Sequence, residues 1–146
     1  MITGVGVALA TIFTKHLEVD VEATVEHAER IVSLGARHVL LSGSTGEAAA
    51  LDESERTALI TAVRAALPAE VPVLAGTGAP STRQALRLTS QAIQAGADAV
   101  LVLSPRGSHE LRVHYTAVAH VAGDVPVLGY HFPGMSEPGI PIGILE

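Results

Sequence analysis

At 146 residues, 48% hydrophobic and 16% charged, the chain is long enough for one domain with a hydrophobic core. A net charge of −6 without any basic cluster argues against nucleic acid as a partner. The absence of cysteine excludes disulfides, thiolate catalysis and cysteine-based zinc sites. No apolar run is long enough to span a membrane and no signal-peptide pattern follows Met1, so we expect a cytoplasmic protein without a membrane partner.

Short apolar runs alternate with longer amphipathic segments along the whole chain. In chain order we expect strand Val5–Ala10, helix Val21–Leu34, strand His38–Ser42, helix Glu53–Leu67, strand Val71–Ala75, helix Thr82–Ala95, strand Ala99–Leu103, helix Glu110–Val121 and strand Val125–Tyr130. The strands are mostly rich in Val or Leu, as is typical of strands buried on both faces. This strict alternation predicts a parallel α/β sheet with right-handed crossovers.

The helix ends carry recognisable signals. Asp52 precedes the second helix and is followed by Glu53 and Glu55, which is typical of an N-cap with acidic residues in the first turn. Ser81 is a weaker cap for the third helix. Gly35 and Gly96 follow the first and third helices, where a C-terminal cap favours glycine.

Two folds are compatible with this order. A five-stranded flavodoxin-like sheet would be complete at this length, whereas a (β/α)8 TIM barrel needs about 250 residues. Glycines and polar residues follow every strand, at Thr11–Lys15, Gly43–Glu47, Gly76–Gly78, Ser104–Ser108 and Tyr130–Pro133. This favours the barrel, whose active site is built from all such loops. We therefore expect a partial (β/α)8 barrel with strands 1 to 5 and four helices, in which residues 1–146 form the N-terminal part of one barrel domain. Because Pro141–Glu146 resembles an interrupted helix, we expect truncation before the sixth strand.

The most informative motif is Gly43-Ser44-Thr45-Gly46-Glu47, which follows the second strand. Two hydroxyls flanked by glycines, together with backbone N–H groups, offer hydrogen-bond donors to a carboxylate or phosphate. Gly43 and Gly46 permit unusual backbone conformations and a close approach of a ligand. The motif therefore predicts a site for a small acidic substrate, although the same hydroxyls are also common in turns that cap helices.

Together these motifs resemble the N-terminal part of the dihydrodipicolinate synthase / N-acetylneuraminate lyase family. The similar segments, in chain order, are Gly6–Thr14, Gly43–Glu47 with Leu51 and Glu55, Val73–Gly78, Ala97–Pro105 and Tyr130-His131-Phe132-Pro133. The second and the last of these carry most of the resemblance. It implies a lysine Schiff-base aldolase or lyase that acts on pyruvate or a related 2-oxo acid and an aldehyde.

The resemblance also implies roles for individual residues. Ser44 and Thr45 would hold the carboxylate of the 2-oxo acid, within the loop that Gly43 and Gly46 shape. Tyr130 would be the general acid/base, and Thr45 would join it in a proton relay. A phenol positioned by a hydroxyl can both donate and accept protons, which suits this role. The resemblance implies no metal and no organic cofactor, and a homo-oligomer as the assembly.

Some residues depart from the family pattern. The family's nucleophilic lysine ends the sixth strand, whereas the single lysine here, Lys15, follows the first strand and is best interpreted as a surface charge. Arg106-Gly107-Ser108 stands where the synthase subgroup has adjacent tyrosines. Gly134–Gly139 lacks the arginine by which that subgroup binds a substrate carboxylate. We therefore expect an activity other than dihydrodipicolinate synthesis.

Other interpretations stay open at this point. Tyr130 could be an ordinary core tyrosine, and Gly76-Thr77-Gly78 fits a tight turn better than a phosphate cradle. The seven histidines lack metal-ligand spacing, so no metal site is predicted. His131 could line the pocket or only fill its loop. The alternative functions are a catalytically incompetent fragment or binding half that needs a complement, and a flavodoxin-like ligand-binding domain.

Overall fold

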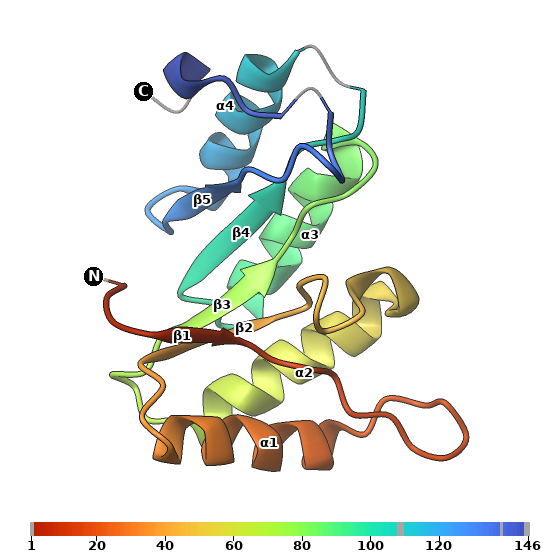
Figure 1. Ribbon diagram of the computed structural model, residues 1–146, viewed down its shortest axis with the longest axis vertical. Helices are drawn as coiled ribbons and strands as arrows, with labels where there is room; N and C mark the ends of the chain where they lie inside the picture. Colours follow the sequence, from red (N-terminus) through yellow and green to blue (C-terminus); the bar gives the residue numbers. More distant parts are fainter. Residues whose placement is uncertain (1, 108–109, 138, 145–146) are drawn as a thin grey trace.

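The computed structural model describes residues 2–107, 110–137 and 139–144 and has one five-stranded parallel sheet (Figure 1). Its strands are β1 (Gly6–Ala8), β2 (His38–Leu41), β3 (Val73–Gly76), β4 (Ala99–Leu103) and β5 (Val127–Tyr130). The helices are α1 (Val21–Ser33), α2 (Glu53–Ala66), α3 (Thr82–Gln94) and α4 (Leu111–Ala122), with short 3-10 helices η1 (Ala48–Ala50) and η2 (Ile142–Ile144). Within the described residues no helix is both long and apolar enough to cross a membrane.

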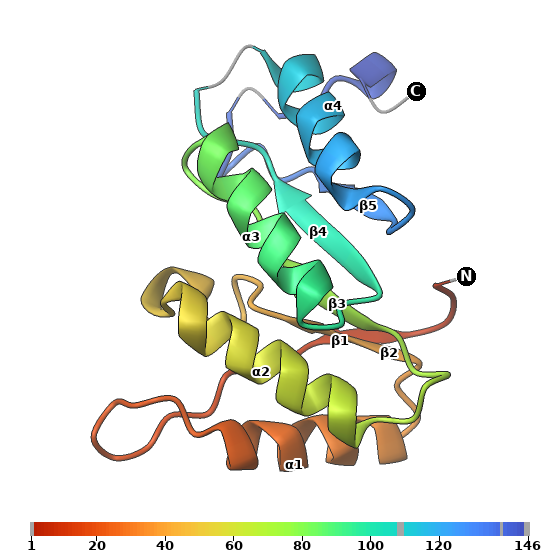
Figure 2. The same cartoon turned by 180° about the vertical axis from the view of Figure 1, so that it is seen from behind.

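The strands lie in the sheet in the same order as in the chain, β1-β2-β3-β4-β5. In a flavodoxin-like sheet the order of the strands would instead reverse at a switch point, so the flavodoxin-like alternative is wrong. All four α-helices cover one face of the sheet. Figure 2 views the molecule from the side on which these helices lie. A sheet wound in one direction with helices on one side is the arrangement of a (β/α)8 barrel, of which this is strands 1 to 5.

The core lies between the sheet and the helices. Val39 and Val73 are partners in neighbouring strands and are fully buried, as is Val100 of β4. Leu59 of α2 and Val118 of α4 are also fully buried. The contacts of these branched side chains fix the register of the sheet, because a slip by one residue would turn them to the opposite face.

Several strand ends differ from the expected bounds, and local hydrogen bonds explain why. β3 and β5 begin two residues later than expected, because the amide of Val71 bonds to the carbonyl of Pro68 and that of Val125 to Ala122. Both amides thus close turns instead of joining the sheet. β2 ends one residue early because Ser42 has φ 52°, in the left-handed region that interrupts a strand.

The predicted helix caps are confirmed. The Asp52 carboxylate accepts the amide of Glu55 at 2.8 Å, and the Glu55 side chain accepts the amide of Asp52 at 2.8 Å. This reciprocal pair is a capping box. Ser81 accepts the amide of Gln84 at 3.3 Å, and Gly35 has φ 106°, as expected for a residue just past a helix. The interrupted helix expected at 141–146 is the 3-10 turn η2 as far as residue 144, and residues 145–146 lie outside the described part.

Candidate active site

The Gly43–Glu47 loop follows β2 at the carboxyl edge of the sheet. It closes on itself, because the amide of Ala48 donates to the carbonyl of Gly43 at 3.2 Å and that of Glu47 to Ser44 at 3.2 Å. Ser44 and Thr45 are exposed. Among the hydrogen bonds between described residues, none involves their hydroxyls, so the capping role that the sequence left open is not the one they take. Both hydroxyls can donate to a ligand.

The glycines of this loop act differently from the prediction. Neither Gly43 nor Gly46 has a positive φ; the left-handed residues are Ser42 and Glu47, each with φ 52°. Gly46 is needed for close packing instead, since a Cβ there would lie 2.9 Å from the carbonyl oxygen of Leu9. Its own carbonyl accepts a hydrogen bond from the buried hydroxyl of Thr11 at 2.7 Å. The loop is therefore anchored to the segment that follows β1.

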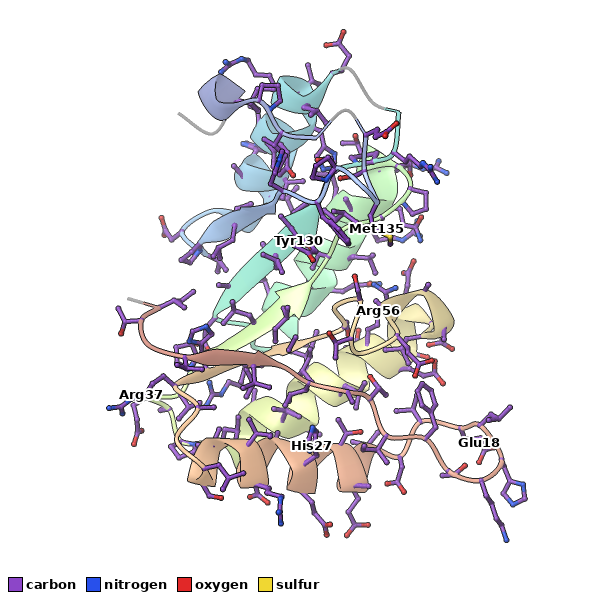
Figure 3. All side chains as sticks on the ribbon, in the orientation of Figure 1. Glu18, His27, Arg37, Arg56, Tyr130 and Met135 are labelled. Atoms are coloured by element: carbon purple, nitrogen blue, oxygen red, sulfur yellow. The ribbon has the colours of Figure 1, made fainter. Side chains whose placement is uncertain are left out.

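Tyr130 is the last residue of β5 and is half-buried. Its ring lies 5.8 Å from that of Phe132, and its hydroxyl makes no hydrogen bond with another described residue. Figure 3 shows it at the end of its strand. His131, next to it, accepts the amide of Ile140 on Nδ1 at 3.1 Å. His131 thus tethers the chain that follows β5, while the phenol of Tyr130 is left available to a ligand.

Parallel pairing places the carboxyl ends of β2 and β5 on the same edge of the sheet. Two strands separate them, which corresponds to about 14 Å along a flat sheet. No hydrogen bond among the described residues joins Thr45 to Tyr130, so the proton relay stays a prediction. Pyruvate is shorter than this span, so both groups reach one molecule only if the curvature of the sheet shortens the distance.

The remaining candidates from the sequence either pack in the fold or lie on its surface. Gly76-Thr77-Gly78 is a tight packing point: the buried Thr77 accepts a hydrogen bond from Thr89 at 3.0 Å, and a Cβ at Gly78 would lie 2.7 Å from the amide of Leu103. Lys15 is exposed on the long loop before α1, whose Glu18 projects from the edge of the molecule (Figure 3). Arg106 is exposed, and Ser108 of the predicted fourth loop lies outside the described residues.

The described residues contain no cluster of three or more His, Asp or Glu that could hold a metal ion. The buried His114 is instead held by the hydroxyl of Thr82 at 3.0 Å, and burial lowers its pKa. Tyr115 lies edge-on to it, with its hydroxyl donating to the carbonyl of Val102 at 3.0 Å. Burial raises the pKa of Tyr115, which keeps this phenol protonated. Tyr115 thus joins α4 to β4, and His114 joins α4 to α3.

Sequence reasoning missed Arg56, which is half-buried on α2. One of its N–H groups donates to the carbonyl of Ala48, just after the Gly43–Glu47 loop. Burial lowers the pKa of its guanidinium, and the charge of Glu53 partly offsets this. The missed signal is spacing: position 56 precedes the buried Leu59, Ile60 and Val63 by three, four and seven residues, which places the arginine on the apolar face of its helix.

Comparisons with known proteins agree on one family. The sequence model described as the dihydrodipicolinate synthetase family matches residues 1–144. A probable mitochondrial 4-hydroxy-2-oxoglutarate aldolase of Emericella nidulans is 40% identical over an alignment of 146 positions, which covers 93% of this chain and 47% of that protein. The chain spans about half the length of the curated relatives it matches.

The solved structures give the same result. A crystal structure of dihydrodipicolinate synthase superposes with a TM-score of 0.91 at 29% identity, covering 99% of this chain and 51% of that one. The synthase of Acinetobacter baumannii in complex with pyruvate superposes with a TM-score of 0.85 at 36% identity, covering 92% of this chain and 47% of that one. The described sheet and helices therefore correspond to about half of these proteins.

Proposed function

Because the chain belongs to the dihydrodipicolinate synthetase family, we propose that it supplies the 2-oxo-acid-binding part of a lysine Schiff-base aldolase or lyase. The observation that carries the proposal is the exposed hydroxyl pair Ser44 and Thr45, at the same edge of the sheet as the phenol of Tyr130. The loop is closed by its own hydrogen bonds and anchored through Gly46, so its donors are fixed before a ligand binds.

In this proposal the hydroxyls and backbone N–H groups of Ser44 and Thr45 hold the carboxylate of pyruvate or a related 2-oxo acid. These donors fix where the carbonyl carbon of the acid lies. The phenol of Tyr130 then donates or accepts the proton at the reacting centre, and Thr45 orients it. The positive imine formed by a lysine withdraws electrons from the bond that breaks, which is why the proposal needs neither metal nor organic cofactor.

In this proposal the amine comes from outside residues 1–146. Lys15 is their single lysine, and it is exposed on the loop before α1. This observation favours the second candidate function, a binding half that is inactive without a complement. We expect the pure chain to bind pyruvate but to form no borohydride-stable adduct with it. A polypeptide that also carries the family lysine is expected to form that adduct, and measurable turnover by the pure chain would exclude the second candidate.

The substrate is proposed to differ from that of the synthases. Arg106-Gly107-Ser108 and Gly134–Gly139 lack the tyrosines and the arginine that the synthase subgroup is expected to have in these loops. Overall identity does not separate the two activities, since a probable 4-hydroxy-2-oxoglutarate aldolase is 40% identical and a 4-hydroxy-tetrahydrodipicolinate synthase of Methylococcus capsulatus is 41% identical; the proposal rests on these two loops. We also propose that the protein is cytoplasmic and forms a homo-oligomer.

The experiment is a pyruvate titration of the chain, followed by the amide resonances in NMR spectra. Saturable shifts at the amides of Ser44, Thr45 and Tyr130 support the proposal. Thr45→Val keeps the size of the side chain and removes its hydroxyl, so it should weaken binding about tenfold, the loss of one hydrogen bond to a charged group. Thr116→Val makes the same change on the exposed surface of α4 and should leave binding unchanged. Equal effects of both variants, or no saturable shift in the loop, would refute the proposal.

A further inference from the structure

A small cavity lies behind the end of β2, between helices α2 and α3. Its polar lining residues are Ser42, Glu53, Arg56, Thr57, Thr77 and Gln91, and Ile60, Leu88 and Ala92 are among its apolar walls. Its volume of about 10 Å³ corresponds to the space that one water molecule needs. The cavity is thus too small for an organic ligand.

Three polar atoms that belong to the residues of this cavity are buried and have no hydrogen-bond partner among the described residues. They are the hydroxyl oxygen of Ser42, Nη1 of Arg56 and Oε1 of Gln91. Ser42 is only 3% exposed. An unpaired buried polar group costs about 1–3 kcal/mol, and more where the group is charged. Three such atoms at one small cavity therefore indicate a bound species that pairs with all of them.

The orientation of Gln91 determines which species fits. Its amide NH2 donates to the carboxylate of Glu53 at 3.0 Å, so its carbonyl oxygen is the atom left to accept. Turning the amide around would set that oxygen against the carboxylate. Glu53 is itself held ionised, because the hydrogen bond from Arg87, more than that from Gln91, lowers its pKa. The occupant must therefore accept from Arg56, donate to Gln91 and pair with the hydroxyl of Ser42.

A water molecule meets all three demands, since it accepts and donates at once. A halide ion would satisfy Arg56 and Ser42 but would face the carbonyl oxygen of Gln91 and leave it without a donor. We propose that one buried water molecule occupies this cavity and links Ser42, Arg56 and Gln91.

The consequence concerns the Gly43–Glu47 loop. The guanidinium of Arg56 also donates to the carbonyl of Ala48, directly after the loop. Through the water it reaches Ser42, directly before the loop, where the chain has its left-handed φ of 52°. Arg56, labelled in Figure 3, is therefore a positioning residue that holds both ends of the loop. The role of Arg56 in positioning the loop rests on the proposed function, whereas the water site does not.

The water is tested by a high-resolution crystal structure of the chain, with and without bromide soaking. We expect one density peak within about 2.7–3.2 Å of all three polar atoms, and no anomalous signal there after the soak. An empty cavity would overturn the proposal. A bromide peak would also overturn it, by showing an anion site. Neither result depends on pyruvate, so failure here leaves the proposed function to its own test.

The link to the loop is tested by amide hydrogen exchange. Ser42→Ala removes one partner of the water, so exchange at the amides of Glu47 and Ala48 should accelerate about tenfold. Ser90→Ala is the matched control, because it makes the same change on α3, outside the lining of the cavity, where the Ser90 hydroxyl accepts a hydrogen bond from the Gln94 side chain. Unchanged exchange in Ser42→Ala, or equal acceleration in both variants, would contradict the role in positioning.

Discussion

Gly76, the last residue of β3, should not tolerate even one added methyl group. A Cβ at this position would lie 2.2 Å from the carbonyl oxygen of Ser42 and 2.8 Å from its carbonyl carbon. An unstrained carbon–oxygen contact is about 3.3 Å, so the ends of β2 and β3 would have to separate by about 1 Å. The obstacle is backbone in a buried part of the sheet, which cannot rotate away as a side chain can.

We expect Gly76→Ala to lower the free energy of unfolding by about 3 kcal/mol, at the upper end of the usual cost of overpacking. For a chain of this size that is a fall in melting temperature of about 6–12 °C. The displacement would begin at Ser42 and Gly43, so binding of pyruvate to the loop should weaken as well. Urea denaturation followed by circular dichroism measures the stability.

Gly134→Ala is the matched control. A Cβ there would be 3.6 Å from the ring of Phe132, an ordinary contact, and the residue is exposed. This variant should keep the stability of the parent chain or gain slightly, because alanine reduces the entropy of the unfolded state. If Gly76→Ala unfolds at the same urea concentration as Gly134→Ala, the close approach of β2 and β3 inferred above is wrong.

Three further variants test other parts of the fold. Arg64 donates hydrogen bonds to Asp98 and to the carbonyls of Leu67, Pro68 and Val71. Arg64→Met should therefore lower the free energy of unfolding by about 2–3 kcal/mol in urea denaturation, whereas Arg83→Met at an exposed position should change it by less than about 0.5 kcal/mol. Asp52→Ala breaks the capping box of α2 and should cost about 1 kcal/mol by the same measurement; no loss would contradict the role of the cap. Burial lowers the pKa of His114 below its ordinary value of 6.5, so the unfolded chain takes up a proton before the folded one. Stability should therefore fall as the pH decreases below about 6.5, and His114→Gln should reduce this slope in unfolding curves measured between about pH 7 and 5; an unchanged slope would exclude His114 as its source.

The order of elements could be predicted from the sequence because it depends on local patterns. Apolar runs, the caps at Asp52 and Ser81, and the glycines after helices are each encoded within a few residues. Strand bounds were less accurate, since the amides of Val71 and Val125 could have entered the sheet or closed a turn. Only the tertiary arrangement decides between these two sets of hydrogen bonds.

The candidate site could likewise be predicted only in part from the sequence. The hydroxyls of the Gly43–Glu47 loop stand out in the sequence because Ser44 and Thr45 are flanked by glycines directly after a predicted strand. The role of Gly46 depends on Leu9 and Thr11, more than thirty residues away in the chain, so local sequence could not reveal it. Gln91 was missed for a similar reason: a glutamine on α3 gains meaning only beside the arginine of α2 that lines the same cavity.

The central claim is that the Gly43–Glu47 loop and Tyr130 bind one 2-oxo acid. A crystal structure of the chain soaked with pyruvate tests it most directly. We predict that the carboxylate accepts hydrogen bonds from Ser44 and Thr45, and that the phenol oxygen of Tyr130 lies within about 3.2 Å of the carbonyl group of the same molecule. Pyruvate bound elsewhere, or bound to the loop with Tyr130 out of reach, would contradict the claim.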